Sequence, residues 1–128
     1  MSKQLWKAGN MLYPLPVVMV SCGTEGVRPN IITVAISIRK ERYSYDIIKE
    51  SGEFVINLVN DRLVRAADWC GVRSGRDYDK FAKMKLTPVA GNTVSVPLIG
   101  ESPVNIECRV KNILELGSHH MFVAEVLQ

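Results

Sequence analysis

The sequence has only three cysteines among its 128 residues, and none has the neighbours that a metal or redox site requires. Cys22, Cys70 and Cys108 show no C-x-x-C spacing and no histidine at a zinc-finger interval. We therefore interpret them as reduced thiols, mostly buried as small hydrophobic side chains, and predict no metal site. A catalytic thiolate is the less favoured alternative.

Long hydrophobic runs are also missing. The longest, residues 15–20, is interrupted by Pro16 and is far too short to cross a bilayer. The N-terminal residues are polar and carry Lys3 and Lys7 with no apolar stretch behind them, unlike a secretory signal. We therefore expect a cytoplasmic protein with no membrane partner.

The sequence lacks the usual signs of nucleic-acid binding and of common nucleotide sites. Its 16 Lys and Arg residues against 13 Asp and Glu give a formal charge of +3, well short of a dense basic stripe. No P-loop pattern and no G-x-G-x-x-G follows a predicted strand. A small basic barrel that binds single strands by stacking stays a weak alternative, because the few aromatic residues do not alternate with basic ones.

What the sequence does contain is the hydrophobic content of one ordinary domain, with 47% hydrophobic and 23% charged residues. Runs rich in β-branched residues predict strands near residues 16–22, 30–39, 54–59, 94–98, 104–116 and 119–127. A turn at residues 23–26 predicts that the first two form a β-hairpin. We expect a mostly β fold, an antiparallel barrel with short helical insertions, as a single domain over residues 1–128.

Three short helical segments are expected between the strands. The first spans residues 44–50, with Ser44 as its N-cap and Gly52 just past its end. The second starts at Asn60 or Asp61 and has one apolar face, made of Leu63, Ala66, Ala67 and Cys70. After a polar link at residues 71–75, residues 76–84 form a short amphipathic segment whose apolar members are Tyr78, Phe81 and Met84.

The most regular alternation lies between residues 104 and 116, where the even positions are apolar except Asn112. It predicts a long, half-buried antiparallel strand. Gly117 and Ser118 then turn the chain into a last strand. On that strand the adjacent His119 and His120 point to opposite faces, so they cannot hold one metal ion together.

Two polar segments offer the groups that bind a phosphate. Residues 37–45 contain Arg39, Lys40, Arg42 and two serines beside an expected helix start, whose free N–H groups carry partial positive charge. Residues 69–76 repeat this chemistry, with two glycines that let a ligand approach the backbone. The alternative for the first segment is a solvated, charged strand end.

The order of several segments resembles the flavin reductase-like family of FMN-binding split barrels. The resemblance covers nearly the whole chain and rests on residues 30–35, 37–39, 43–48, 52–58, 69–71, 74–75, 79–81 and 117–119, with Phe122 and Glu125. It implies an antiparallel split barrel that forms a homodimer, with FMN bound noncovalently at the subunit interface. It also implies an oxidoreductase activity in which NAD(P)H delivers hydride to the flavin, which passes electrons to a flavin, iron or a partner protein.

The resemblance assigns roles residue by residue. It places Asn30 and Thr33 beside the isoalloxazine ring, and it surrounds the ribityl chain and phosphate with Ser37, Ile38, Arg39, Lys40 and Ser44. Arg73 and Ser74 are the second contact on the phosphate side. His119 matches a histidine near the nicotinamide, where it positions the hydride donor as the predicted catalytic residue. The alternative for His119 is a hairpin residue that fixes the turn, and His120 is expected to serve packing.

The chain departs from the family pattern in two places. Relatives carry a loop rich in Thr, Gly and Pro that helps to grip the flavin, whereas here Ala35 runs directly into Ile36. Relatives also continue beyond the strand that ends at Gln128. We expect either a chain that omits residues or a shortened relative with an incomplete flavin site. An FMN-carrying electron-transfer protein without a nicotinamide site, as in flavoredoxin, is the alternative function.

Overall fold

The computed structural model of the protein describes residues 18–21 and 33–128. In chain order, the elements in these ranges are β1 (Val18–Ser21), β2 (Thr33–Arg39), α1 (Tyr43–Ser51), β3 (Glu53–Leu58), α2 (Val64–Val72), α3 (Lys80–Lys83), β4 (Pro88–Val89), β5 (Leu98–Ile99), β6 (Asn105–Leu116) and β7 (His119–Val126). None of the helices among the described residues is long and apolar enough to cross a membrane.

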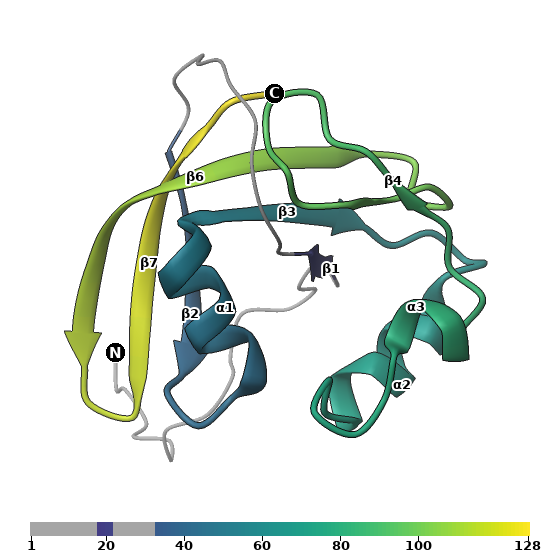
Figure 1. Ribbon diagram of the computed structural model, residues 1–128, viewed down its shortest axis with the longest axis horizontal. Helices are drawn as coiled ribbons and strands as arrows, with labels where there is room; N and C mark the ends of the chain where they lie inside the picture. Colours follow the sequence, from purple (N-terminus) through teal and green to yellow (C-terminus); the bar gives the residue numbers. More distant parts are fainter. Residues whose placement is uncertain (1–17, 22–32) are drawn as a thin grey trace, which may run out of the picture.

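Five strands form one curled antiparallel sheet in the order β1-β3-β6-β7-β2 (Figure 1). This arrangement confirms the predicted mostly β, antiparallel split barrel. The predicted hairpin between the first two strands is wrong, because β1 pairs with β3 and β2 pairs with β7 at the opposite edge. The turn at residues 23–26 lies outside the described residues. The continuous pairing of β2 along its whole length shows that Ala35 and Ile36 belong to one strand.

The long strand β6 changes its inward face at a bulge between Val110 and Asn112. Before the bulge the alternation predicted from the sequence holds. Beyond it Ile113 packs on the core, whereas Leu114 and Leu116 are 40% and 54% exposed. The even-position pattern is therefore wrong after the bulge, because one extra residue shifts every later side chain to the other face of the sheet. Lys111, the extra residue, reaches across to Glu125 on β7, with 2.6 Å between Nζ and Oε2.

The predicted strand at residues 94–98 is also wrong, since only Leu98–Ile99 form a short strand, β5, paired with β4. Buried Glu107 of β6 holds the preceding segment as a loop instead. Its Oε1 accepts backbone N–H groups from Asn92, Thr93 and Val94, at 2.7, 3.1 and 3.4 Å. The N–H groups of this loop are therefore satisfied by a carboxylate rather than by a strand ladder.

The concave side of the sheet holds a cluster that we call the sheet core, in which α1 packs against the strands (Figure 1). Its buried members are Tyr45, Ile48, Phe54, Ile56, Cys108, Phe122 and Ala124. His120 is also buried, and its Nδ1 lies 2.7 Å from the Tyr45 hydroxyl, which agrees with the packing role expected for it. His119 is exposed, so the two histidines do face opposite sides.

Helix α1 begins one residue earlier than predicted. Arg42 occupies the N-cap position without a capping side chain, so the assignment of Ser44 as N-cap is wrong and Ser44 lies in the first turn. The predicted end is confirmed, because Gly52 adopts φ = 70° and donates its N–H to the Ile48 carbonyl at 2.8 Å.

A second cluster, which we call the helical cluster, lies beneath α2 and α3. Its buried members are Leu63, Ala66, Leu86 and Ile99, and Ala67, Cys70 and Phe81 pack against them. The predicted apolar face of α2 is therefore confirmed. Its predicted start is wrong, because Asn60 Oδ1 accepts the Leu63 N–H in a turn before the helix at 3.2 Å. Of the amphipathic segment predicted at residues 76–84, only Lys80–Lys83 form a helix, α3, and Asp79 caps its N-terminus.

Candidate functional site

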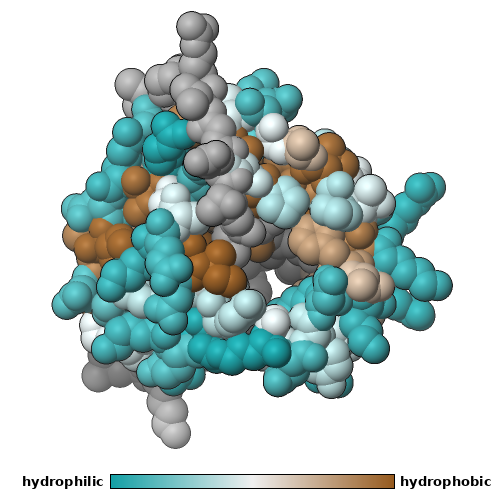
Figure 2. All heavy atoms as spheres, in the orientation of Figure 1, coloured by the Kyte–Doolittle hydropathy of each residue, from teal (hydrophilic) through white to brown (hydrophobic). Residues whose placement is uncertain are grey.

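A cleft of about 510 Å³, here the first cleft, lies between α1 with the end of β2 on one side and the end of α2 with the following loop on the other. Its volume is in the range of small-molecule sites. It is lined by Val20, Ile36, Ser37, Ile38, Arg42, Tyr43, Ser44, Ile48, Cys70, Gly71, Arg73, Ser74, Gly75 and Lys80. Figure 2 shows that this view of the molecule carries hydrophobic residues within a border of hydrophilic ones.

The first cleft brings together the two polar segments that the sequence analysis singled out. Ser37 and Ser44 come from residues 37–45, and Arg73 and Ser74 come from residues 69–76. Residues 46–68, 23 in number, separate the two segments in the chain. Hydroxyl donors and a guanidinium therefore face one space from two sides. This is the arrangement that a phosphate requires.

The start of α1 adds further donors to this cleft. The Tyr45 N–H donates to the carbonyl of the N-cap residue Arg42 at 3.1 Å, whereas the N–H groups of Tyr43 and Ser44 before it have no acceptor within an α-helix and no side-chain cap. Arg42 and Ser44 line the cleft at this helix end. Fixed positive charge and a helix N-terminus thus occupy the same rim.

Lys80 closes the opposite rim, and the sequence analysis did not select it as a binding residue. Its ammonium group donates to the Cys70 carbonyl at 2.6 Å, which ties α3 to the end of α2. The Cys70 thiol lines the cleft, and burial raises its pKa while the nearby Lys80 lowers it in part. The thiol is therefore protonated at neutral pH. Lys80 lies within residues 79–81, which contributed to the family resemblance, so a signal for it was present.

Tyr43 is a second residue that the analysis did not select, and it lines all three clefts described here. Gly75 packs directly against its ring. A Cβ on Gly75 would lie only 2.7 Å from Tyr43 Cδ1, so only glycine allows this approach. The Tyr43 ring is thereby a wall shared between neighbouring clefts.

A second cleft of about 450 Å³ adjoins the first and has a more apolar wall. It shares Tyr43, Ser44, Cys70 and Lys80 with the first cleft. Residues that belong to it but not to the first cleft include Ile47, Ala67, Phe81, Leu86 and Ile99. Most of these come from the helical cluster, so this part of the hydrophobic interior borders on an open space.

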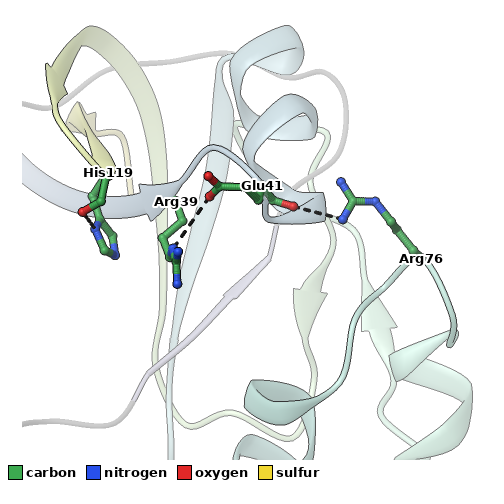
Figure 3. A network of polar contacts seen from close by, with 5 residues as sticks. Arg39, Glu41, Arg76 and His119 are labelled. Atoms are coloured by element: carbon green, nitrogen blue, oxygen red, sulfur yellow. Dashed lines mark hydrogen bonds and ion pairs between the residues drawn. The ribbon is translucent and has the colours of Figure 1, made fainter.

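A third cleft of about 310 Å³ holds the Arg39 side chain, together with Glu41, Arg42, Tyr43, Ser74 and Arg76. Figure 3 shows Arg39, Glu41 and Arg76 in a row. The Arg39 Nε lies 3.7 Å from Glu41 Oε2, and Arg76 Nη1 donates to the Glu41 carbonyl at 3.0 Å. Arg39 and Ser74 thus share a cleft, which adjoins the first cleft through Arg42, Tyr43 and Ser74.

The other predicted site residues lie apart from these clefts or outside the described ranges. His119 pairs with Arg39 across β2 and β7, and its Nδ1 lies 2.9 Å from the Ser118 hydroxyl in the hairpin turn. Lys40 is exposed and lines none of the three clefts. The Thr33 backbone pairs with Glu125 on β7, and Asn30 lies outside the described residues.

Comparisons with known proteins agree with this fold. The family profile described as "Flavin reductase like domain" matches residues 11–128. An uncharacterized protein of Archaeoglobus fulgidus is 35% identical over 129 residues, which covers 91% of this chain and 72% of that protein. The solved structure of flavoredoxin from Desulfovibrio vulgaris (Miyazaki F) is 32% identical, with a TM-score of 0.84, and the match covers 99% of this chain and 75% of that chain.

A relative with a named activity is more distant. An NADPH-flavin oxidoreductase of Streptomyces viridifaciens is 27% identical over 101 residues, which covers 75% of this chain and 50% of that protein.

Proposed function

This chain belongs to the flavin reductase-like domain family, and we propose that it binds FMN in the first cleft and uses it in an NAD(P)H-dependent redox reaction. Family membership supports a flavin-related redox function. When bound, FMN supplies the redox centre that takes a hydride from NAD(P)H and passes electrons to a second acceptor. The protein contributes binding, orientation and electrostatics.

The groups that line the first cleft fit each part of FMN. Arg73, Lys80 and the start of α1 suit the phosphate, because each is a donor that carries full or partial positive charge. Serine hydroxyls suit the ribityl chain. The apolar side chains of the same cleft, Val20, Ile36, Ile38 and Ile48, suit one face of an aromatic ring.

The observation that carries the proposal is the convergence of Ser37 and Ser44 with Arg73 and Ser74 on one cleft. The sequence places these pairs on two separate segments, and either segment alone is an ordinary solvated surface. Two donor sets that face the same space are hard to explain by solvation alone. They keep a phosphate in one position by contacts from both sides.

A titration of the full chain with FMN tests the proposal. We expect quenching of FMN fluorescence and a yellow protein. The double variant Arg73→Gln/Ser74→Ala should bind FMN about tenfold to a hundredfold more weakly, because hydrogen bonds to charged groups contribute about 1.5–3 kcal/mol. Arg65→Gln on the exposed face of α2 is the matched control. Unchanged affinity in the double variant, or no FMN binding by the full chain, would contradict the proposal.

A homodimer with the flavin at the subunit interface is part of the same proposal. The exposed Leu114 and Leu116 on the outer side of the sheet support it, because large apolar side chains gathered at one strand end favour a protein contact. Light scattering should give twice the mass of one chain. The variant Leu116→Glu should lower the measured mass towards that of a single chain. The single domain over residues 1–128 and the cytoplasmic location stay predictions.

An FMN-carrying electron-transfer protein without a nicotinamide site is the second candidate. The similarity to flavoredoxin supports this alternative, as does the position of His119 outside the three clefts. Rapid mixing of the FMN-loaded protein with NADPH separates the two candidates. Loss of the blue absorbance with NADPH supports the reductase, and loss only with dithionite supports the carrier. In the reductase, His119→Ala should slow this bleaching without weakening FMN binding.

A further inference from the structure

The third cleft carries an excess of positive charge beside the proposed FMN site. Three arginines line it, Arg39, Arg42 and Arg76, against the single carboxylate of Glu41. The Arg39–Glu41 pair is long, at 3.7 Å, and both side chains are more than half exposed, so it neutralises little charge. Two positive charges are therefore left over in a cleft of about 310 Å³.

The Arg76 guanidinium is held in place by groups that do not neutralise it. Arg76 donates to the backbone carbonyl of Glu41, and its guanidinium carbon lies 5.7 Å from the centre of the Tyr43 ring. Among the described residues, no carboxylate pairs with Arg42 or Arg76. A guanidinium that is positioned but not paired is suited to an anion from outside the protein.

The first and third clefts share Arg42, Tyr43 and Ser74. FMN in the first cleft and a second ligand in the third would therefore lie next to each other. FMN carries a single phosphate, and the first cleft already offers Arg73, Lys80 and the start of α1 for it. The cations that line the third cleft but not the first, Arg39 and Arg76, are left for a second phosphate group. A terminal phosphate monoester carries a charge of about −1.5 to −2, which matches the excess of two positive charges.

We propose that the third cleft binds the 2′-phosphate of NADPH, with Arg39 and Arg76 as the residues that distinguish NADPH from NADH. This inference rests on the proposed function, because it assigns the donor that reduces the bound flavin. It differs from the role that the family resemblance gave to Arg39, which was a contact to the phosphate of FMN itself. The shared chemistry is a phosphate monoester, and the test separates the two sources.

The test compares adenosine 2′,5′-bisphosphate, which carries the 2′-phosphate, with adenosine 5′-monophosphate, which does not. Calorimetric titration of the FMN-loaded protein should show tighter binding of the bisphosphate. Arg76→Gln and Arg39→Gln should each weaken bisphosphate binding about tenfold, and leave the monophosphate and FMN unchanged. The KM for NADPH should rise by a similar factor with no change for NADH. The bisphosphate affinity of Arg76→Lys should lie between those of the unaltered protein and Arg76→Gln, because lysine keeps the positive charge but lacks the planar guanidinium with its paired donors.

Arg65→Gln on the exposed face of α2 controls for a general loss of positive charge. Equal binding of bisphosphate and monophosphate by the unaltered protein would overturn the inference. Weaker FMN binding in Arg76→Gln would also overturn it, because the third cleft would then hold the phosphate of the cofactor. If FMN does not bind at all, the proposed function fails, and the same titration of the FMN-free protein still decides whether the third cleft selects a 2′-phosphate.

Discussion

The sheet core and the helical cluster are built in different ways. The sheet core joins residues from α1, β3, β6 and β7, so its members come from positions 45 to 124 of the chain. The helical cluster draws its buried members only from positions 63 to 99. Phe54, Cys108 and Phe122 in the sheet core are fully buried, whereas Phe81 and Cys70 in the helical cluster are partly exposed. Both regions border on a cleft, the sheet core through Ile48 and the helical cluster through Leu86 and Ile99, but only the sheet core also contains large side chains that are fully buried.

The two regions therefore have different roles, one in fixing the sheet and the other in forming the wall of the second cleft. The sheet core fixes the curled sheet by long-range strand pairing. Leu86 and Ile99 of the helical cluster are buried but line the second cleft, so among the described residues one side of that cluster borders on a cleft. Regions with fewer buried contacts open at lower free energy. We expect the walls around the ligand to adjust while the sheet stays unchanged.

The largest expected effect comes from emptying the sheet core. Phe122→Ala should lower the free energy of unfolding by about 3–5 kcal/mol, because it removes a fully buried ring and leaves a cavity. Phe81→Ala, the same change in the helical cluster, should cost about half as much, since that ring is only half-buried. Urea denaturation measures both. Equal losses would show that the two regions are equally well packed.

The next effect concerns the two thiols and pH. Burial raises the pKa of Cys108 from 9.0 to about 12, and the nearby Glu107 carboxylate adds to the rise. The unfolded chain ionises this thiol first, so its contribution to stability is complete below pH 9 and is lost as the pH rises towards 12. At about pH 11 the unaltered protein should have lost about 2–3 kcal/mol more than Cys108→Ala has.

Cys70→Ala is the matched control for this pH dependence. Its thiol is only half-buried, and Lys80 offsets part of the rise in its pKa. Stability of this variant should therefore follow the unaltered protein closely above pH 9. A larger change in Cys70→Ala than in Cys108→Ala would reverse the proposed contrast between the two regions.

A smaller effect is expected from the carboxylates that hold loops. Glu107→Gln should cost about 1–3 kcal/mol, because a buried oxygen that accepts three backbone N–H groups loses its charge. Glu101 near the helical cluster also accepts a backbone N–H, from Thr87 at 2.6 Å, and this bond lowers its pKa. Glu101 is exposed, so Glu101→Gln should cost less. Thermal unfolding of the two variants gives the comparison, and a costlier Glu101→Gln would contradict it.

The smallest change in stability is expected at the edge of the clefts. Gly75→Ala should displace the Tyr43 ring and weaken FMN binding several-fold, with unfolding changed by about 1 kcal/mol or less. Asp68→Ala is the control, because this side chain is exposed on α2 and lines none of the three clefts. It should leave FMN affinity unchanged and alter the free energy of unfolding by less than about 1 kcal/mol. Fluorescence titration measures the FMN affinity of each variant. An equal affinity in Gly75→Ala and the unaltered protein would show that Tyr43 does not contribute to the FMN site.

Much of the sheet could be predicted, because its strands alternate between apolar and polar residues. The end of α1 at Gly52 and the apolar face of α2 followed from equally local signals. The meeting of residues 37–45 and 69–76 was predicted in outline, since both segments carry the same phosphate-binding chemistry and the resemblance placed both at one cofactor. The structure adds that the two segments line opposite walls of the first cleft.

The errors arise where a distant partner decides the structure. The bulge after Val110 has only a small sign in the sequence, because Asn112 is polar at an even position and Ile113 is apolar at an odd one, while Leu114 and Leu116 return to the even pattern. Residues 94–96 have the composition of a strand, but the carboxylates of Glu107 and Glu53 accept the N–H groups of Val94 and Ser95 in a loop. Tyr43 was overlooked because its role depends on Gly75, which lies far away in the chain. Such contacts depend on the finished fold and not on neighbouring residues.

The bulge in β6 also decides which side chains the last hairpin presents to other molecules. Lys111 is the unpaired residue, and beyond it Ile113 lies opposite Phe122 whereas Leu114 lies opposite Met121. Deleting Lys111 would straighten the strand and leave these pairs unchanged, because Asn112 would then follow Val110 directly in the ladder. Shortening the chain at this one position therefore keeps the apolar exterior of the hairpin and removes only the ion pair with Glu125.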